Sequence, residues 1–249
     1  MTNTETVLID CHAHTPKVSP CCKGTVEGII LETKNKGIDG IILTNHYSGD
    51  YIGPSKRYAD SKEMAQDHIN EYKKVKTIGE EQNFVVFFGV EISMTLYKYV
   101  HLLVYGVDED FLFNNLDMYD YTQERLYKAV KEAGGVLVQA HPLRIERNLL
   151  LDPNFLDGIE INSHLFYEGT HYEELSEFAR KNRLILTSGG DYHVDTERPH
   201  CGMYLPKSIK NTKDFAKYLC TTDSVHLLMQ EPYQTESYER IFVKEKSEL

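Results

Sequence analysis

The chain has 249 residues, of which 41% are hydrophobic, and a formal net charge of −11; this length suits one large domain such as an α/β barrel. The negative charge argues against duplex nucleic acid as a partner, because proteins that bind it usually present a basic face. The sequence has no signal peptide, no apolar run near the about 18 residues of a membrane span and no C-x-x-C pattern, so we expect a cytoplasmic protein with no membrane partner.

Apolar strands alternate with amphipathic helices along most of the chain. An apolar run at 7–9 is followed by a predicted helix over 25–36 and a buried strand over 38–44, an order typical of a parallel sheet. Further strands are predicted at 84–92, 99–105, 136–142, 158–162, 184–193 (the last residues being a loop) and 225–229, and further helices at 58–82, 122–132, 171–182 and 212–219. With no linker or repeat, we predict a single α/β domain over 1–249, in which 232–249 are a loosely held C-terminal tail.

The first strand leads directly into the motif Asp10-x-His12-x-His14. Side chains alternate across a strand, so these three point the same way. Two neutral imidazoles on a rigid strand form half of a divalent-metal site, and a carboxylate beside them can hold their free N–H groups. The alternative is a strand end with solvated histidines.

The same residue types recur where other strands end. They are His12, His14, His46, Glu91, His141, Asp191 and His193, with His101 as an exception at the start of its strand. In α/β barrels the C-terminal mouth is where sites are built. Histidine with carboxylate suits zinc, manganese or iron, and a carboxylate such as Glu91 can bridge two ions, an arrangement suited to hydrolysis of a phosphate ester.

Six short motifs occur in order between about residues 7 and 205. They are Asp10-x-His12-x-His14, Thr44-Asn45-His46, Gly89-Val90-Glu91, His101-Leu102-Leu103-Val104-Tyr105-Gly106, Ala140-His141-Pro142 and Gly190-Asp191-Tyr192-His193. Together they resemble the PHP (polymerase and histidinol phosphatase) superfamily. The resemblance implies a distorted (β/α)7 TIM-like barrel, two to three divalent metal ions (Zn, Mn or Fe) and phosphoesterase activity.

Carried over position by position, the resemblance implies three ligand sets. One ion is bound by His12, His14, Glu91 and Asp191, a second by Glu91, His101 and His141, and a third by His46 and His193. Asp10 is placed behind the ligands, where it holds His12 or His14, and Asn45 orients His46 through its amide oxygen in place of the usual Asp.

The chain departs from this pattern where members of the superfamily usually offer another ligand of the third ion. Here Pro20, Cys21 and Cys22 stand in place of an Asp or His. Either a thiolate substitutes for that ligand, or the third ion is weakly bound or absent.

Two arginines on the expected mouth loops, Arg144 and Arg198, are candidates for binding a substrate phosphate, since a guanidinium matches phosphate bidentately. We predict a metal-dependent phosphoesterase that hydrolyses a small phosphomonoester, of histidinol phosphate or nucleotide type, by attack of a metal-bound hydroxide, with Asp191 or His193 assisting proton transfer. Two alternatives are a metal-binding regulatory module without turnover and a metal-dependent hydrolase of a non-phosphate bond.

Overall fold

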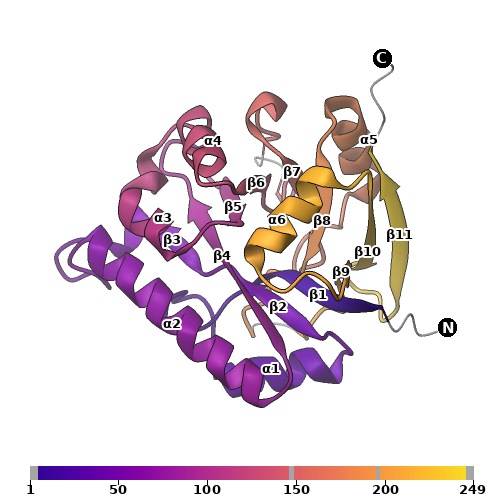
Figure 1. Ribbon diagram of the computed structural model, residues 1–249, viewed down its shortest axis with the longest axis horizontal. Helices are drawn as coiled ribbons and strands as arrows, with labels where there is room; N and C mark the ends of the chain where they lie inside the picture. The colour runs from indigo at the N-terminus through magenta and orange to yellow at the C-terminus, as the bar shows by residue number, and fades with distance from the viewer. Residues whose placement is uncertain (1–4, 146–148, 195–196, 245–249) are drawn as a thin grey trace.

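A computed structural model describes residues 5–145, 149–194 and 197–244 (Figure 1). The strands are β1 (Thr6–Ala13), β2 (Gly40–Leu43), β3 (His46–Ser48), β4 (Val85–Ser93), β5 (His101–Tyr105), β6 (Val136–Gln139), β7 (Gly158–Asn162), β8 (Ile185–Gly189), β9 (Gly202–Pro206), β10 (Ser224–Gln230) and β11 (Ser237–Val243). The α-helices are α1 (Val26–Asn35), α2 (Ser61–Glu81), α3 (Glu109–Asn114), α4 (Gln123–Glu132), α5 (Tyr172–Asn182) and α6 (Thr212–Thr221), and short 3-10 turns are at Gly49–Tyr51, Met118–Asp120 and Pro153–Phe155.

The strands form one mixed sheet in the order β11-β10-β9-β1-β2-β4-β5-β6-β7-β8, with β3 paired to β4. Strands β1, β2 and β4 pair in parallel, as do β6, β7 and β8, whereas β5 runs antiparallel to both of its neighbours. The sheet curls into a nearly closed barrel with helices outside it, which confirms the predicted α/β, TIM-like barrel (Figure 1).

The barrel closes beside the first sequence motif. The amide of Asp191 donates to the carbonyl of His12 at 3.0 Å, and Ala13 forms a parallel bridge with Tyr192. The end of β1 therefore meets the loop after β8. This contact brings the first and last predicted ligand motifs, 179 residues apart between His12 and Asp191 in the numbering, to one place.

Antiparallel β5 explains the position of His101. Its partner strands β4 and β6 run the other way, so the start of β5 lies at the same barrel end as their C-termini. His101 pairs in register with Ser93, the last residue of β4. The side chain of His101 therefore lies at the common mouth, although His101 begins its strand.

Helix boundaries follow from local side-chain caps. Thr25, Asp60, Thr122 and Asn211 each accept a hydrogen bond from an amide of the first turn that follows. Such caps satisfy amides that have no partner inside the helix.

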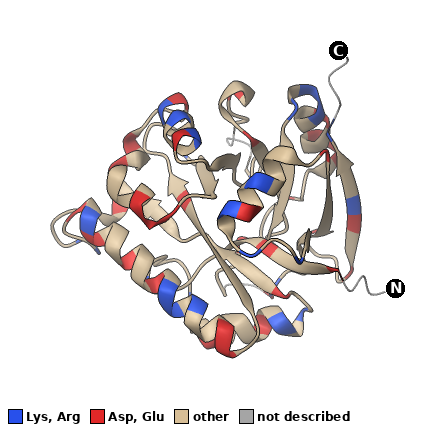
Figure 2. Cartoon of the chain, viewed as in Figure 1, with Lys and Arg blue, Asp and Glu red and all other residues tan. Residues whose placement is uncertain are grey.

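The charged residues lie largely on the outward-facing helices (Figure 2). Among the described residues, no helix combines the length and apolar character needed to cross a membrane.

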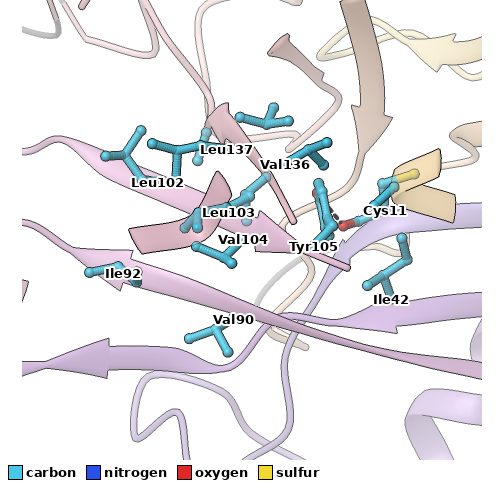
Figure 3. Packing of buried hydrophobic residues seen from close by; sticks show 14 of the residues in the cluster. Cys11, Ile42, Val90, Ile92, Leu102, Leu103, Val104, Tyr105, Val136 and Leu137 are labelled. Atoms are coloured by element: carbon cyan, nitrogen blue, oxygen red, sulfur yellow. Dashed lines mark hydrogen bonds between the residues drawn. The ribbon is translucent and has the colours of Figure 1, made fainter. Parts of the chain in front are cut away.

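Both faces of the central strands are buried in the main core. Val90, Leu102, Leu103 and Val104 are fully buried there, and the Tyr105 hydroxyl donates to the carbonyl of Cys11 at 2.8 Å (Figure 3). This bond satisfies the one polar atom of the Tyr105 ring deep in the core. The core therefore holds β1 and β5 at a fixed relative position below the mouth.

The expected loose tail over 232–249 is wrong for much of its length. Residues Ser237–Val243 form β11, which pairs antiparallel with all of β10. Phe242 is buried, and the Tyr238 hydroxyl hydrogen-bonds Glu231. The alternation of single apolar and polar residues in this strand is weak, so tertiary pairing rather than pattern decides its structure.

Candidate metal centre

The structure brings the eight predicted ligands together at the barrel mouth. Seven are buried and His101 is partly exposed. Ligand-type atoms of seven of them, all but His141, gather in three groups, in each of which all atoms lie within 4.8 Å of one another. The groups are His14, His46 and His193; His12, His14, Glu91 and Asp191; and His46, Glu91 and His101. Each of these groups could hold a metal ion.

Glu91 stands at the middle of the cluster. Its carboxylate oxygens lie 2.6–3.3 Å from a nitrogen of each of five imidazoles, those of His12, His14, His46, His101 and His141. The register of the sheet sets this up, because β3 pairs with β4 so that His46 lies opposite Glu91. One carboxylate shared among so many nitrogen donors suits a ligand that bridges two ions.

Asp191 faces the same imidazoles from the loop after β8. Its Oδ1 lies 3.0 Å from His14 Nε2 and 3.4 Å from His12 Nε2. Its Oδ2 accepts a hydrogen bond from the Tyr167 hydroxyl at 2.5 Å. Asp191 and His141 both have left-handed backbone conformations, with φ of 49° and 29°. Such conformations cost of order 1 kcal/mol each and concentrate at functional sites.

Three histidines have Nδ1 occupied by a group that is not one of the predicted ligand atoms. His12 Nδ1 lies 2.9 Å from Glu160, His14 Nδ1 lies 3.1 Å from the Ser19 hydroxyl and His193 Nδ1 lies 2.7 Å from the carbonyl of Asp191. When Nδ1 carries the proton, the lone pair is on Nε2. All three rings therefore direct a donor nitrogen into the cluster, as ligands to a metal do.

The donor set fits divalent ions by a second criterion. His12 Nε2 and His46 Nδ1 lie 3.3 and 2.6 Å from Glu91 Oε2, yet none of these three buried atoms forms a hydrogen bond. Buried polar atoms normally have a hydrogen-bond partner, and one that lacks it suggests a bound water or ion. The mix of imidazole and carboxylate is the one that zinc, manganese and iron prefer.

The charges around the site hold the ligands in mixed protonation states. Burial opposes ionisation of Glu91, but His46, His101 and His12 outweigh it and hold its pKa well below the usual range. Burial and the charge of Arg144 lower the pKa of His141 to about 3, so that ring is neutral at physiological pH. A neutral imidazole is the form that binds a metal.

Glu160 is a site residue that the sequence reasoning missed. It lies in β7, is fully buried and accepts hydrogen bonds from His12 Nδ1, from the amide of His141 at 2.8 Å and from Asn162 at 2.9 Å. Gly189 makes room for it, because a Cβ there would lie 2.4 Å from Glu160 Oε1. A lone carboxylate inside the apolar stretch 158–162 was the available signal.

The predicted role of Asp10 is therefore wrong in detail. Its Oδ1 accepts from the backbone amides of His12 and Gly190, at 2.9 and 3.0 Å, and its Oδ2 binds Arg198. No imidazole of the cluster is among the hydrogen-bond partners of its carboxylate in the described structure. Asp10 fixes the backbone around the site, whereas Glu160 holds the ring of His12.

The prediction that Arg198 binds phosphate is also contradicted. Arg198 is buried, forms an ion pair with Asp10 and lies over the Tyr192 ring at 4.6 Å. Burial behind the first strand removes its guanidinium from the mouth. The sequence could not show whether Arg198 is buried or exposed, because the loop that carries it has no periodic pattern.

Arg144 does lie at the mouth. One of its guanidinium nitrogens lies 3.3 Å from His141 Nε2 and donates to the Tyr167 hydroxyl at 3.1 Å. It lines a cavity of about 570 Å³, together with His46, His101, Tyr51 and other residues of the mouth loops. A cation thus faces an open space directly beside the candidate ligands.

The first loop packs over the other side of the cluster. Asn45 does not touch the His46 ring in the way predicted: its amide oxygen accepts from the Thr15 amide at 2.8 Å and from the Ser19 hydroxyl at 2.9 Å. Ser19 in turn accepts from the backbone amide of His46 at 3.0 Å. Asn45 therefore orients the loop, and through Ser19 the ring of His14 as well.

Comparison with known proteins identifies similar folds. No protein-family model and no curated protein matches the sequence. A crystal structure of a "putative metal-dependent phosphoesterase" from Bifidobacterium adolescentis is similar over 85% of this chain and 95% of its own, with a TM-score of 0.52 and 17% identity. PsfC from Pseudomonas syringae is similar over 86% of this chain and 88% of its own, with a TM-score of 0.60 and 17% identity. At this identity the likeness establishes the fold.

Proposed function

We propose that the chain is a metal-dependent phosphoesterase of the PHP superfamily that hydrolyses a small phosphomonoester. The observation that carries the proposal is the Glu91 carboxylate, buried among five imidazoles. A shared carboxylate with so many nitrogen donors suits closely spaced ions, and such pairs suit displacement at phosphorus. The described phosphoesterase of similar fold supports the same reaction class.

Three ligand sets follow from the proposal. His12, His14, Glu91 and Asp191 would hold one ion, Glu91, His101 and His141 a second, and His46 and His193 a third. When bound, the ions would supply an activated water and neutralise charge on the phosphoryl group. Glu160, Ser19 and the carbonyl of Asp191 keep three of the rings turned inward.

Arg144 is the residue we assign to the phosphoryl oxygens. Its guanidinium borders the mouth cavity, and Tyr167 and His141 fix its position. A preorganised guanidinium stabilises the negative charge that develops in the transition state without having to reorganise. The leaving group would lie in the remainder of the cavity, between Tyr51 and Tyr99.

Proton transfer is assigned to Asp191 or His193, which adjoin each other at the mouth. The two side chains are 3.5 Å apart between His193 Nδ1 and Asp191 Oδ1. Burial opposes ionisation of Asp191, but neighbouring imidazoles outweigh it and hold its pKa well below the usual range, so the carboxylate is ionised at neutral pH. His193 Nε2 lies on the cluster side, and it can take part in proton transfer when it is not bound to an ion.

The test is hydrolysis of p-nitrophenyl phosphate by protein supplied with manganese or zinc, compared with His141→Ala. We expect turnover in the parent protein and a loss of at least 100-fold in the variant, about the effect of one lost metal ligand or acid–base group. His226→Ala is the matched control, because His226 is partly exposed on β10, where it pairs with Glu239 and lies against the Tyr204 ring, away from the cluster.

Two results would contradict the proposal. Bound metal without turnover on a panel of phosphomonoesters would favour a regulatory metal-binding module. Turnover of a carboxylic ester or amide in place of phosphate would favour a hydrolase of another bond. Circular dichroism of His141→Ala separates loss of catalysis from loss of fold.

A further inference from the structure

Tyr167, in the loop after β7, connects the residue assigned to phosphate with one of those assigned to metal. Its hydroxyl lies 3.1 Å from Arg144 Nη1 and 2.5 Å from Asp191 Oδ2. A guanidinium has donors only, so Arg144 donates the first of these bonds and the hydroxyl proton is left for the carboxylate of Asp191. One oxygen atom therefore stands between a cation and an anion.

The ring of Tyr167 is held by contacts that do not involve its hydroxyl. It stacks on the His164 imidazole, with 4.6 Å between the ring centroids, and lies edge-on to His141 at 5.9 Å. The Tyr167 amide donates to the carbonyl of His164 at 3.1 Å. His164 is buried, and its own amide donates to the side chain of Asn162, the last residue of β7, at 2.9 Å. We therefore expect removal of the hydroxyl to leave the ring in place.

Arg144 and Asp191 carry opposite charges but do not touch. Among the described residues, the cationic partners in contact with the Asp191 carboxylate are imidazoles, and Arg144 reaches it only through Tyr167. The attraction between opposite charges grows as their separation shortens, and a guanidinium beside a carboxylate forms a strong pair. With no atom between them, these two side chains would close into a direct ion pair.

We propose that Tyr167 is a positioning residue that keeps Arg144 and Asp191 apart. The inference rests on the proposed function, in which Arg144 binds phosphoryl oxygens and Asp191 binds an ion. A direct pair would draw the guanidinium away from the mouth cavity and would compete with the ion for the carboxylate. Because the hydroxyl binds Oδ2, the other oxygen of Asp191 stays 3.4 and 3.0 Å from Nε2 of His12 and His14.

The test is Tyr167→Phe in the full-length chain, measured alone and together with Arg144→Ala. Tyr167→Phe should let Arg144 pair with Asp191 and lower the affinity for Mn²⁺ by at least about tenfold, as measured by competition with a chromophoric chelator. In the Arg144→Ala background no cation is left to form that pair, so Tyr167→Phe should change the affinity by less than about threefold. A role of Tyr167 in packing alone would not depend on Arg144.

Hydrolysis of p-nitrophenyl phosphate at saturating Mn²⁺ is the second readout. Tyr167→Phe should lower kcat/KM by about as much as Arg144→Ala does, and the double variant should be no worse than Arg144→Ala. Tyr204→Phe is the matched control, because the Tyr204 hydroxyl also donates to a carboxylate, that of Glu239, at 3.0 Å and away from the cluster. It should leave both readouts unchanged. Tyr167→Met removes the same hydroxyl and replaces Tyr167→Phe if that variant folds poorly.

The outcomes separate this inference from the proposed function. An equal loss of Mn²⁺ affinity with and without Arg144 would mean that Tyr167 acts on Asp191 alone, and would overturn the inference. Unchanged affinity and unchanged kcat/KM in Tyr167→Phe would also overturn it. A parent protein that binds Mn²⁺ but hydrolyses no phosphomonoester would contradict the proposed function, while the affinity measurements would still decide the role of Tyr167. No bound Mn²⁺ in the parent protein would overturn both.

Discussion

Replacing Glu160 with Gln tests how the ring of His12 is held. Glu160 accepts from His12 Nδ1 at 2.9 and 3.1 Å, while its Oε2 also accepts from the amide of His141 and from Asn162. Gln has nearly the same shape and can place its carbonyl oxygen at the Oε2 position. It therefore keeps the bonds from His141 and Asn162 but removes the negative charge facing His12.

The expected magnitude follows from that geometry. Partners that orient a metal-ligating histidine typically contribute 10- to 100-fold to metal affinity, so Glu160→Gln should weaken ion binding by about that factor, or about 1.4–2.7 kcal/mol. The ion-free protein should lose less, within about 1 kcal/mol, because burial raises the pKa of Glu160 and so already disfavours its charged form.

The assay is competition with a chromophoric chelator for Mn²⁺ or Zn²⁺, together with urea unfolding of the chelator-treated protein. Asp157→Asn is the matched control, since Asp157 immediately precedes the same strand β7 but lies at its other end, where it pairs with Lys131. Equal metal affinity of the Glu160→Gln and Asp157→Asn variants would refute the idea that Glu160 orients His12.

Three further predictions follow. Arg144→Ala should lower kcat/KM for an aryl phosphate by about 10- to 100-fold, the worth of a charged hydrogen bond, with metal content unchanged. Arg198→Met should lower the free energy of unfolding by about 3–5 kcal/mol in urea titrations, because it leaves Asp10 charged and buried, while KM of the folded enzyme stays within about twofold. A larger change in the KM of the Arg198→Met variant would instead indicate that Arg198 binds the substrate phosphate. Nearby Glu91 and Cys21 raise the pKa of His46 to about 10 against the effect of burial, so ion binding near neutral pH must displace a proton. Ion affinity should therefore rise with pH, by about tenfold per unit for each proton released, and a flat profile between pH 6 and 8 would contradict it.

The arrangement of the ligands was largely predictable from sequence. Each predicted ligand follows or begins an apolar strand, and strand ends of one barrel share a mouth, so local patterns suffice to bring them together. His101 is instructive, because a strand start reaches the mouth only if that strand is antiparallel. The sequence indicated that His101 begins a strand, and the antiparallel direction of β5 explains why it still reaches the mouth.

The residues that support the ligands were harder to predict. Asp10 lies two residues from His12, yet it binds the backbone and Arg198, while Glu160, 148 residues away from His12, holds the ring. Proximity in sequence indicates which residues are neighbours along one strand. It does not indicate which other strand of the barrel supplies a hydrogen-bond partner. The contact depends on Gly189, whose missing side chain leaves space between the strands.

The C-terminal strand β11 was missed for a related reason. Its residues alternate too little to mark a buried face, and four of the seven are exposed. Its pairing with β10 fixes it in place. An edge strand of this kind depends on a partner that the local sequence does not specify.

The most direct test of the account is the number of metal ions per chain in protein purified without chelator, measured together with hydrolysis of an aryl phosphate by the same sample. The account predicts two or three ions per chain and turnover that is lost on chelation and restored by manganese or zinc. Protein that is folded, free of metal and unable to bind added ions would contradict it, because the buried histidines and carboxylates would then have a structural role alone.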